Sequence, residues 1–135
     1  MLDLNGNDQW DGCTTDGCIP FGAPSDRPVS GDWNNDGFSD IGVYRNGTWL
    51  LDLNGNRKWD GCATDGCFPF GAPSDFPVVG DWNNDGFSQG VGVKRGGQWF
   101  LDRNNNRVWE GCLTDGCITG FGAAGDVPVG GRWAP

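Results

Sequence analysis

The chain has 135 residues, a single-domain length, and its 18 acidic and 9 basic residues give a formal net charge of −9. This charge excludes the basic surface with which proteins bind nucleic acids or anionic membranes. No apolar run approaches the ~18 residues that span a bilayer, and the absence of histidine removes the commonest general base.

The chain consists of three copies of one unit. LDLNGN at 2–7 recurs at 51–56 and, as LDRNNN, at 101–106, which are shifts of 49 and 50 residues. We expect one repeat domain, 1–135, divided into repeat 1 at 1–40 (incomplete at its N-terminal end), repeat 2 at 41–90 and repeat 3 at 91–135 (incomplete at its C-terminal end). Because a repeat cannot bury its apolar face alone, we expect a homo-oligomer or fibre formed head to tail, or part of a longer repeat array.

The predicted elements are all strands. In chain order they are a hairpin over 41–50 around Asn-Gly, an edge strand at 68–70 that contains proline, a strand at 77–79 and a hairpin over 91–101 around Gly-Gly. No window shows helical spacing of apolar residues, so no helix longer than one turn is expected. The prediction is an all-β fold of tandem repeats that resemble β-propeller blades, with a fibre-forming β-solenoid as the alternative.

The segment 32–40, DWNNDGFSD, is the first candidate metal site. Oxygen-bearing side chains stand at positions 1, 3, 5 and 9 with glycine at position 6, as at the start of a Ca²⁺-binding loop. The alternative is ordinary Asn-Asp-Gly turn chemistry, but a turn needs fewer such residues than this loop contains. The predicted ligands are Asp32, Asn34, Asp36, Asp40 and the backbone carbonyl of Phe38.

The second copy of this loop, 81–89, repeats the pattern with one acidic residue fewer. Its predicted ligands are Asp81, Asn83, Asp85, the carbonyl of Phe87 and Gln89. Since an amide replaces a carboxylate at position 9, we expect weaker Ca²⁺ affinity. The third copy has Arg132 at position 1, and no cation site is expected there.

A second class of loop occurs once in each unit, with two acidic residues and two asparagines at positions 1, 3, 5 and 9. A hydrogen-bonded Asx turn explains this spacing almost as well as a metal site does. We nevertheless predict cation sites, because the spacing is kept in three copies whose intervening residues differ. The predicted ligands are Asp3, Asn5, Asn7 and Asp11; Asp52, Asn54, Asn56 and Asp60; and Asp102, Asn104, Asn106 and Glu110.

The six cysteines form three pairs with four residues between partners, and a Thr-Asp-Gly turn inside each pair can bring the two Cα atoms within disulfide range. Zinc is the alternative, but it would require two pairs from different repeats to converge. Disulfides would place the chain outside the cytosol, in the extracellular space or at a cell surface. The predicted bridges are Cys13–Cys18, Cys62–Cys67 and Cys112–Cys117.

The tryptophans recur in register, and two roles are open to them. Core packing is favoured because every copy has its tryptophan and the chain is poor in aliphatic residues; an exposed sugar-stacking surface is the alternative. The three sets are Trp10, Trp59 and Trp109; Trp49 and Trp99; and Trp33, Trp82 and Trp133.

The combination of FGAP at 21–24 and 70–73, the GDWNNDGFSD loop and the IGVYRNGTW strand that follows it resembles FG-GAP/VCBS-type repeats of bacterial extracellular proteins and integrin-like β-propellers. The resemblance implies blade-like units with Ca²⁺ in the loop between strands. We therefore expect a non-enzymatic, extracellular Ca²⁺-binding module with a structural or adhesive role. The alternatives are a lectin-like module that binds a glycan and, less favoured, a hydrolase fragment with paired carboxylates.

Overall fold

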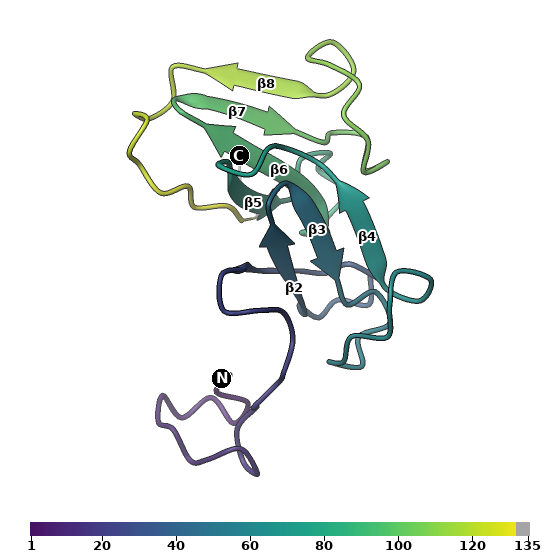
Figure 1. The fold of residues 1–135 in the computed structure, drawn as a ribbon, viewed down its shortest axis with the longest axis vertical. Coiled ribbons are helices and arrows are strands. Elements are labelled where there is room, and N and C mark those ends of the chain that lie inside the picture. Colours follow the sequence, from purple (N-terminus) through teal and green to yellow (C-terminus); the bar gives the residue numbers. More distant parts are fainter. Residues whose placement is uncertain (132–135) are drawn as a thin grey trace.

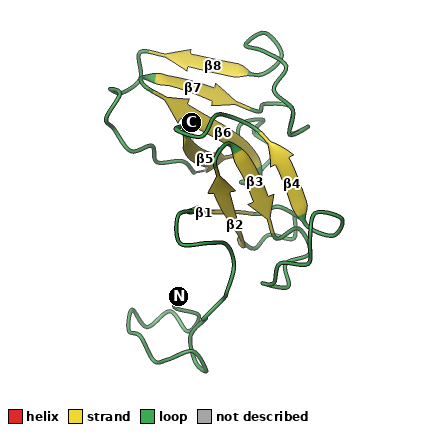
Figure 2. Ribbon diagram, viewed as in Figure 1, coloured by secondary structure: helices red, strands yellow, loops and turns green. Residues whose placement is uncertain are grey.

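The computed structural model describes residues 1–131, and within that range it contains strands, turns and loops but no helix (Figure 2). The strands form two antiparallel sheets, each a meander whose spatial order follows the chain. Sheet 1 contains β1 (Arg27–Gly31), β2 (Asp40–Arg45), β3 (Thr48–Leu51) and β4 (Gly66–Pro69). Sheet 2 contains β5 (Phe76–Gly80), β6 (Gly90–Arg95), β7 (Gln98–Leu101) and β8 (Gly116–Thr119). The predicted all-β class is confirmed.

Equivalent residues take the same register in the two sheets. Tyr44 pairs with Trp49 across β2 and β3, and Lys94 pairs with Trp99 across β6 and β7. The β2–β3 turn holds Asn46 and Gly47 at positive φ, 50° and 90°, which is the backbone that an Asn-Gly hairpin needs. The predicted divisions after residues 40 and 90 each fall one residue into a strand. The period of a repeat gives the length of the unit but does not determine which residue is its first.

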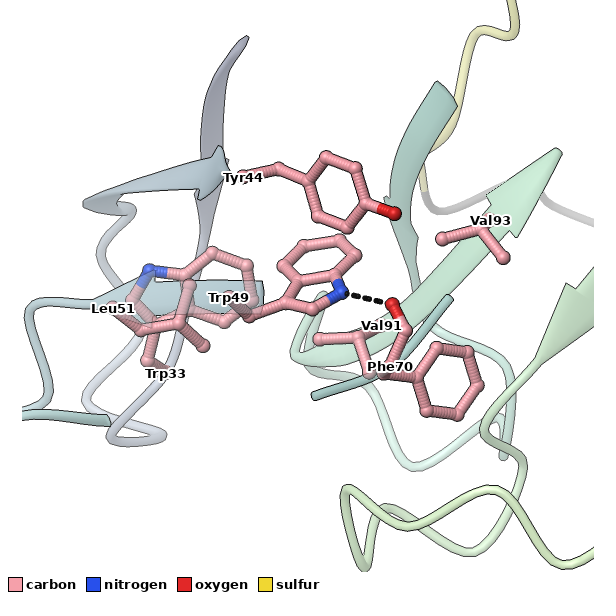
Figure 3. Packing of buried hydrophobic residues seen from close by; sticks show 7 residues of the cluster. All are labelled: Trp33, Tyr44, Trp49, Leu51, Phe70, Val91 and Val93. Carbon is pink, nitrogen blue, oxygen red and sulfur yellow. Dashed lines mark hydrogen bonds between the residues drawn. The ribbon is translucent and has the colours of Figure 1, made fainter. Parts of the chain in front are cut away.

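Aromatic residues of sheet 1 pack against valines of sheet 2 (Figure 3). Trp49 is completely buried, and its indole Nε1 donates a hydrogen bond to the Phe70 carbonyl over 2.9 Å. Val91 and Val93 of β6 close the cluster from the other side. Since one aromatic side chain buries roughly 150–250 Å², a few of them replace the aliphatic core that this sequence lacks.

The first strands of the two sheets lie close together. The Asp32 N–H at the end of β1 donates to the Ser88 carbonyl over 3.0 Å. Residues of β1, β5 and the segment 128–131 together line a cleft of about 320 Å³. The N-terminal segment, purple in Figure 1, forms loops at one end of the molecule, where Leu2 and Gly17 form an isolated β-bridge.

The tryptophans differ in burial, and Trp82 is half-buried against the cluster of Val78, Trp99 and Leu101. Trp33, Trp49 and Trp99 are buried, as predicted for core residues. The prediction was wrong for Trp10, Trp59 and Trp109, which are 50%, 41% and 40% exposed. The reason is their place on exposed loops. Trp59 meets Phe21 of the preceding unit edge-to-face, and Trp109 meets Phe70 of the preceding unit and Phe100 of its own unit in the same way. Trp133 lies outside the described residues.

Within residues 1–131 there is no helix with the length and apolarity needed to cross a membrane.

Candidate cation sites

The loop 32–40 joins β1 to β2 and folds around its own carboxylates. Both oxygens of the buried Asp32 accept backbone N–H groups, from Asp36 and Gly37, each over 3.0 Å. The Asn34 side-chain oxygen accepts the Asp36 N–H over 3.0 Å, and Asp36 Oδ1 accepts the Phe38 N–H over 2.9 Å. The predicted position-1, -3 and -5 ligands are therefore brought together on the inside of one turn. The side chain of Phe38 is exposed, so only its carbonyl could serve as a ligand.

Asp40 closes this loop in an unfavourable environment. Its Oδ2 is buried and accepts no hydrogen bond. Burial, and after it the carboxylates of Asp36, Asp52 and Asp32 in that order of effect, raise the pKa of Asp40 to about 6. A buried carboxylate with three negative neighbours is costly to keep ionised. A hard divalent cation, with its preference for oxygen ligands, fits this donor set.

The loop 81–89 has the same backbone pattern but a different position 9. Asp81 accepts the N–H groups of Asp85 and Gly86, over 3.0 and 2.9 Å. The side-chain amide of Gln89 donates to Asp85 Oδ2 over 2.7 Å, so that a neutral donor, rather than a third carboxylate, faces the acidic group. This contact is consistent with the weaker Ca²⁺ affinity expected for the second copy.

The second-class loops are closed by amide groups. In loop 52–60 the side-chain amides of Asn54 and Asn56 both donate to Asp60 Oδ2, over 3.2 and 2.6 Å, and the Arg57 N–H donates to Asp52 Oδ2 over 2.6 Å. The predicted ligands are thus assembled in one loop, and the bonds are those of Asx turns. The same bonds recur in the other two copies, where Asn5 and Asn7 donate to Asp11, and Asn104 and Asn106 donate to Glu110.

The two loop classes of one sheet touch at Gly55. A Cβ atom at this residue would lie 3.1 Å from Asp40 Oδ1 and 3.2 Å from Asn34 Nδ2. The close approach explains why glycine occupies position 4 of loop 52–60, where its φ is +68°. In the equivalent loop the residue is Asn105, which also has positive φ and whose buried side-chain amide has no hydrogen-bond partner.

No three Asp, Glu, Cys or His side chains within residues 1–131 converge closely enough to form a complete metal centre by themselves. Asparagine and backbone oxygens would have to complete the coordination at each candidate site. Arg132, where no site was expected, lies outside the described residues.

The sequence analysis missed three aspartates. Asp16, Asp65 and Asp115 were interpreted only as turn residues between paired cysteines, yet they are 2%, 3% and 1% exposed. In each, Oδ2 accepts the N–H of the last residue of the preceding second-class loop, over 2.6–2.7 Å. The available signal was that TDG recurs unchanged in all three copies, although the flanking residues differ.

The three predicted disulfides are present. Cys13–Cys18, Cys62–Cys67 and Cys112–Cys117 have Cα–Cα distances of 5.0, 5.1 and 5.0 Å. Because all six cysteines are paired, none is left for the alternative zinc site. Three disulfides indicate an oxidising environment of the extracellular type.

No family model, curated protein or solved structure matches the chain.

Proposed function

We propose that the chain is a non-enzymatic, extracellular calcium-binding β-repeat module with a structural or adhesive role. The observation that carries the proposal is the Asp40 carboxylate, whose buried Oδ2 has no donor and whose neighbours are Asp32, Asp36 and Asp52. These residues come from the end of β1, the start of β2 and the end of β3. A bound Ca²⁺ would offset their mutual repulsion and would link three parts of sheet 1.

We further propose that each sheet is a blade-like unit. Three features support this arrangement. The two four-stranded meanders have equivalent registers, and their first strands, β1 and β5, lie close together. Residues 128–131 line a cleft together with β5. It agrees with the resemblance to FG-GAP/VCBS-type repeats. Head-to-tail association and a cell-surface location remain predictions.

Calcium is expected to raise the melting temperature of the oxidised protein by about 10 °C over that in excess EDTA. The basis is that an ion that binds only the folded state at about 100 times its Kd adds about 2.7 kcal/mol, and 1 kcal/mol shifts the melting temperature of a chain of this size by about 4 °C. Circular dichroism or calorimetry would measure the difference. Magnesium serves as the control, because it demands tighter octahedral geometry. Equal melting temperatures in EDTA and in millimolar calcium would contradict the proposal.

Carbohydrate binding is the second candidate, and a repeated groove favours it. One groove, of about 470 Å³, lies along Phe21, Arg45 and Trp59. The other, of about 300 Å³, lies along the equivalent residues Phe70, Arg95 and Trp109. A half-exposed indole beside a guanidinium offers an apolar face and hydrogen-bond donors together, which suits a sugar ring.

If this second candidate holds, a glycan panel will quench tryptophan fluorescence, and the double variant Trp59→Ala/Trp109→Ala will lose the response at least tenfold. Trp10→Ala is the matched control, since Trp10 is also exposed, at 50%, but lines neither groove. An unchanged fluorescence response in the double variant, or no response from the wild type, would remove carbohydrate binding from consideration.

A further inference from the structure

The strand register places two aspartates opposite one another where the third strand of each sheet ends and the fourth begins. The last pair in the β3–β4 ladder is Leu51 with Gly66, and the same register continued by one residue sets Asp52 opposite Asp65. In sheet 2 the last pair is Leu101 with Gly116, followed by Asp102 with Asp115. The third strand keeps its pairing with the second strand at this point, because the Asp52 N–H donates to the Ile41 carbonyl of β2 over 3.1 Å and the Asp102 N–H to the Val91 carbonyl of β6 over 3.0 Å.

All four of these side chains are buried, and each has one oxygen without a partner. Asp52 and Asp102 are 0% exposed, Asp65 is 3% and Asp115 is 1% exposed. In each the Oδ2 accepts one backbone N–H, while the buried Oδ1 accepts no hydrogen bond. Residues directly opposite in an antiparallel pair point to the same face with Cβ atoms ~4.5–5.5 Å apart. The register therefore sets both carboxylates of a pair on the same face of the sheet, each with a buried, unpartnered oxygen.

Within residues 1–131 no basic side chain forms an ion pair with either aspartate pair. The ion pairs within residues 1–131 are Arg45–Asp26 and Arg95–Asp75. Arg107 is close enough to Asp102 for their charges to interact, but its guanidinium donates instead to the Trp33 carbonyl, over 3.4 Å. Like charges opposed across a strand pair are destabilising, and burial without a counter-charge adds a desolvation cost.

We propose that each facing pair, Asp52 with Asp65 and Asp102 with Asp115, holds one divalent cation of the Ca²⁺ type between its unpartnered carboxylate oxygens. Asparagine and backbone oxygens of the adjoining second-class loop would complete the 6–8 oxygen ligands that Ca²⁺ takes. These sites are separate from those in the loops 32–40 and 81–89. The inference extends the proposed calcium dependence to them and rests on that proposal.

The disulfides have a defined role in this arrangement. The Cys62–Cys67 bridge closes the turn in which the Thr64 and Asp65 N–H groups donate to the Gly61 carbonyl, over 3.0 and 2.9 Å. The turn holds Asp65 opposite Asp52, and Cys112–Cys117 does the same for Asp115. A covalently closed turn therefore keeps two like charges together before an ion arrives.

The test is the double variant Asp65→Asn/Asp115→Asn, compared with Asp36→Asn/Asp85→Asn. Asparagine keeps an oxygen that can accept the Asp60 and Glu110 N–H groups, but it removes the negative charge. Native mass spectrometry in calcium should show one fewer ion per altered pair for Asp65→Asn/Asp115→Asn, whereas Asp36→Asn/Asp85→Asn should keep those ions. Melting should show a reversal of sign: Asp65→Asn/Asp115→Asn raises the melting temperature in EDTA and lowers it in calcium.

The outcomes separate the two proposals. If the wild type binds no calcium, both fail. If it binds calcium and Asp65→Asn/Asp115→Asn keeps the full ion count, only the facing pairs are overturned as sites. A variant that is less stable than the wild type in EDTA would also overturn the inference, since it would mean that the pair shares a proton or a hydrogen bond that favours the fold without metal.

Discussion

Replacing Trp49 with alanine is expected to lower the free energy of unfolding by about 3–5 kcal/mol. Trp49 has no exposed surface. Its ring packs edge-to-face with Tyr44 and is stacked on Phe68, and its indole N–H donates to the Phe70 carbonyl. Alanine would leave a cavity between the two sheets and an unpaired carbonyl. Because domains of this size have only ~5–15 kcal/mol of stability, a large fraction of the chain would unfold at 37 °C.

Urea denaturation followed by far-ultraviolet circular dichroism would measure this loss. Trp59→Ala is the matched control, because Trp59 is 41% exposed and touches Phe21 only at its edge; it should cost no more than about 1–2 kcal/mol, within the range of ordinary substitutions. Equal losses for the two variants would show that the stability does not depend on the packing of sheet 1 against sheet 2.

The features that the sequence predicted well are local. The hairpin turn at Asn46-Gly47 and the disulfides depend on residues a few positions apart, and the structure contains both. The DxNxDG pattern likewise predicted which side chains turn inward at Asp32, because that geometry is set within one loop.

The features that the sequence did not predict depend on strand register or on contact between units. Asp65 lies thirteen positions after Asp52 in the sequence, and only the β3–β4 ladder places the two opposite one another. Gly55 at position 4 had no explanation until loop 32–40 was found against it. The exposure of Trp59 depends on how much of it the preceding unit covers. The recurrence of tryptophan at equivalent positions gives no information on that contact.

The position-9 residues of the first-class loops should set which sheet binds calcium first. In the wild type, Asp40 supplies a carboxylate where Gln89 supplies an amide, and one such charge is worth about tenfold in affinity. The double exchange Asp40→Gln/Gln89→Asp should therefore reverse the order, changing the ratio of the two affinities about a hundredfold. The same exchange leaves the net charge of −9 unchanged, so a general effect of charge cannot account for the reversal.

The same position-9 substitutions should also change the melting temperature of the metal-free protein. Asp40 has a pKa raised to about 6 by burial and by the carboxylates of Asp36, Asp52 and Asp32, so at pH 7 its ionised form destabilises the fold without metal, and Asp40→Gln alone should raise the melting temperature in EDTA. Gln89→Asp should lower the melting temperature in EDTA, since the amide that donates to Asp85 over 2.7 Å is replaced by a negative charge that repels it.

Calcium titrations of the wild type and of the double exchange would show which sheet binds calcium first. The nuclear magnetic resonance signals of Gly37 and Gly86 would report on sheet 1 and sheet 2 separately. If sheet 1 still binds first after the exchange, position 9 does not coordinate the ion, and the assignment of Asp40 as a ligand is wrong.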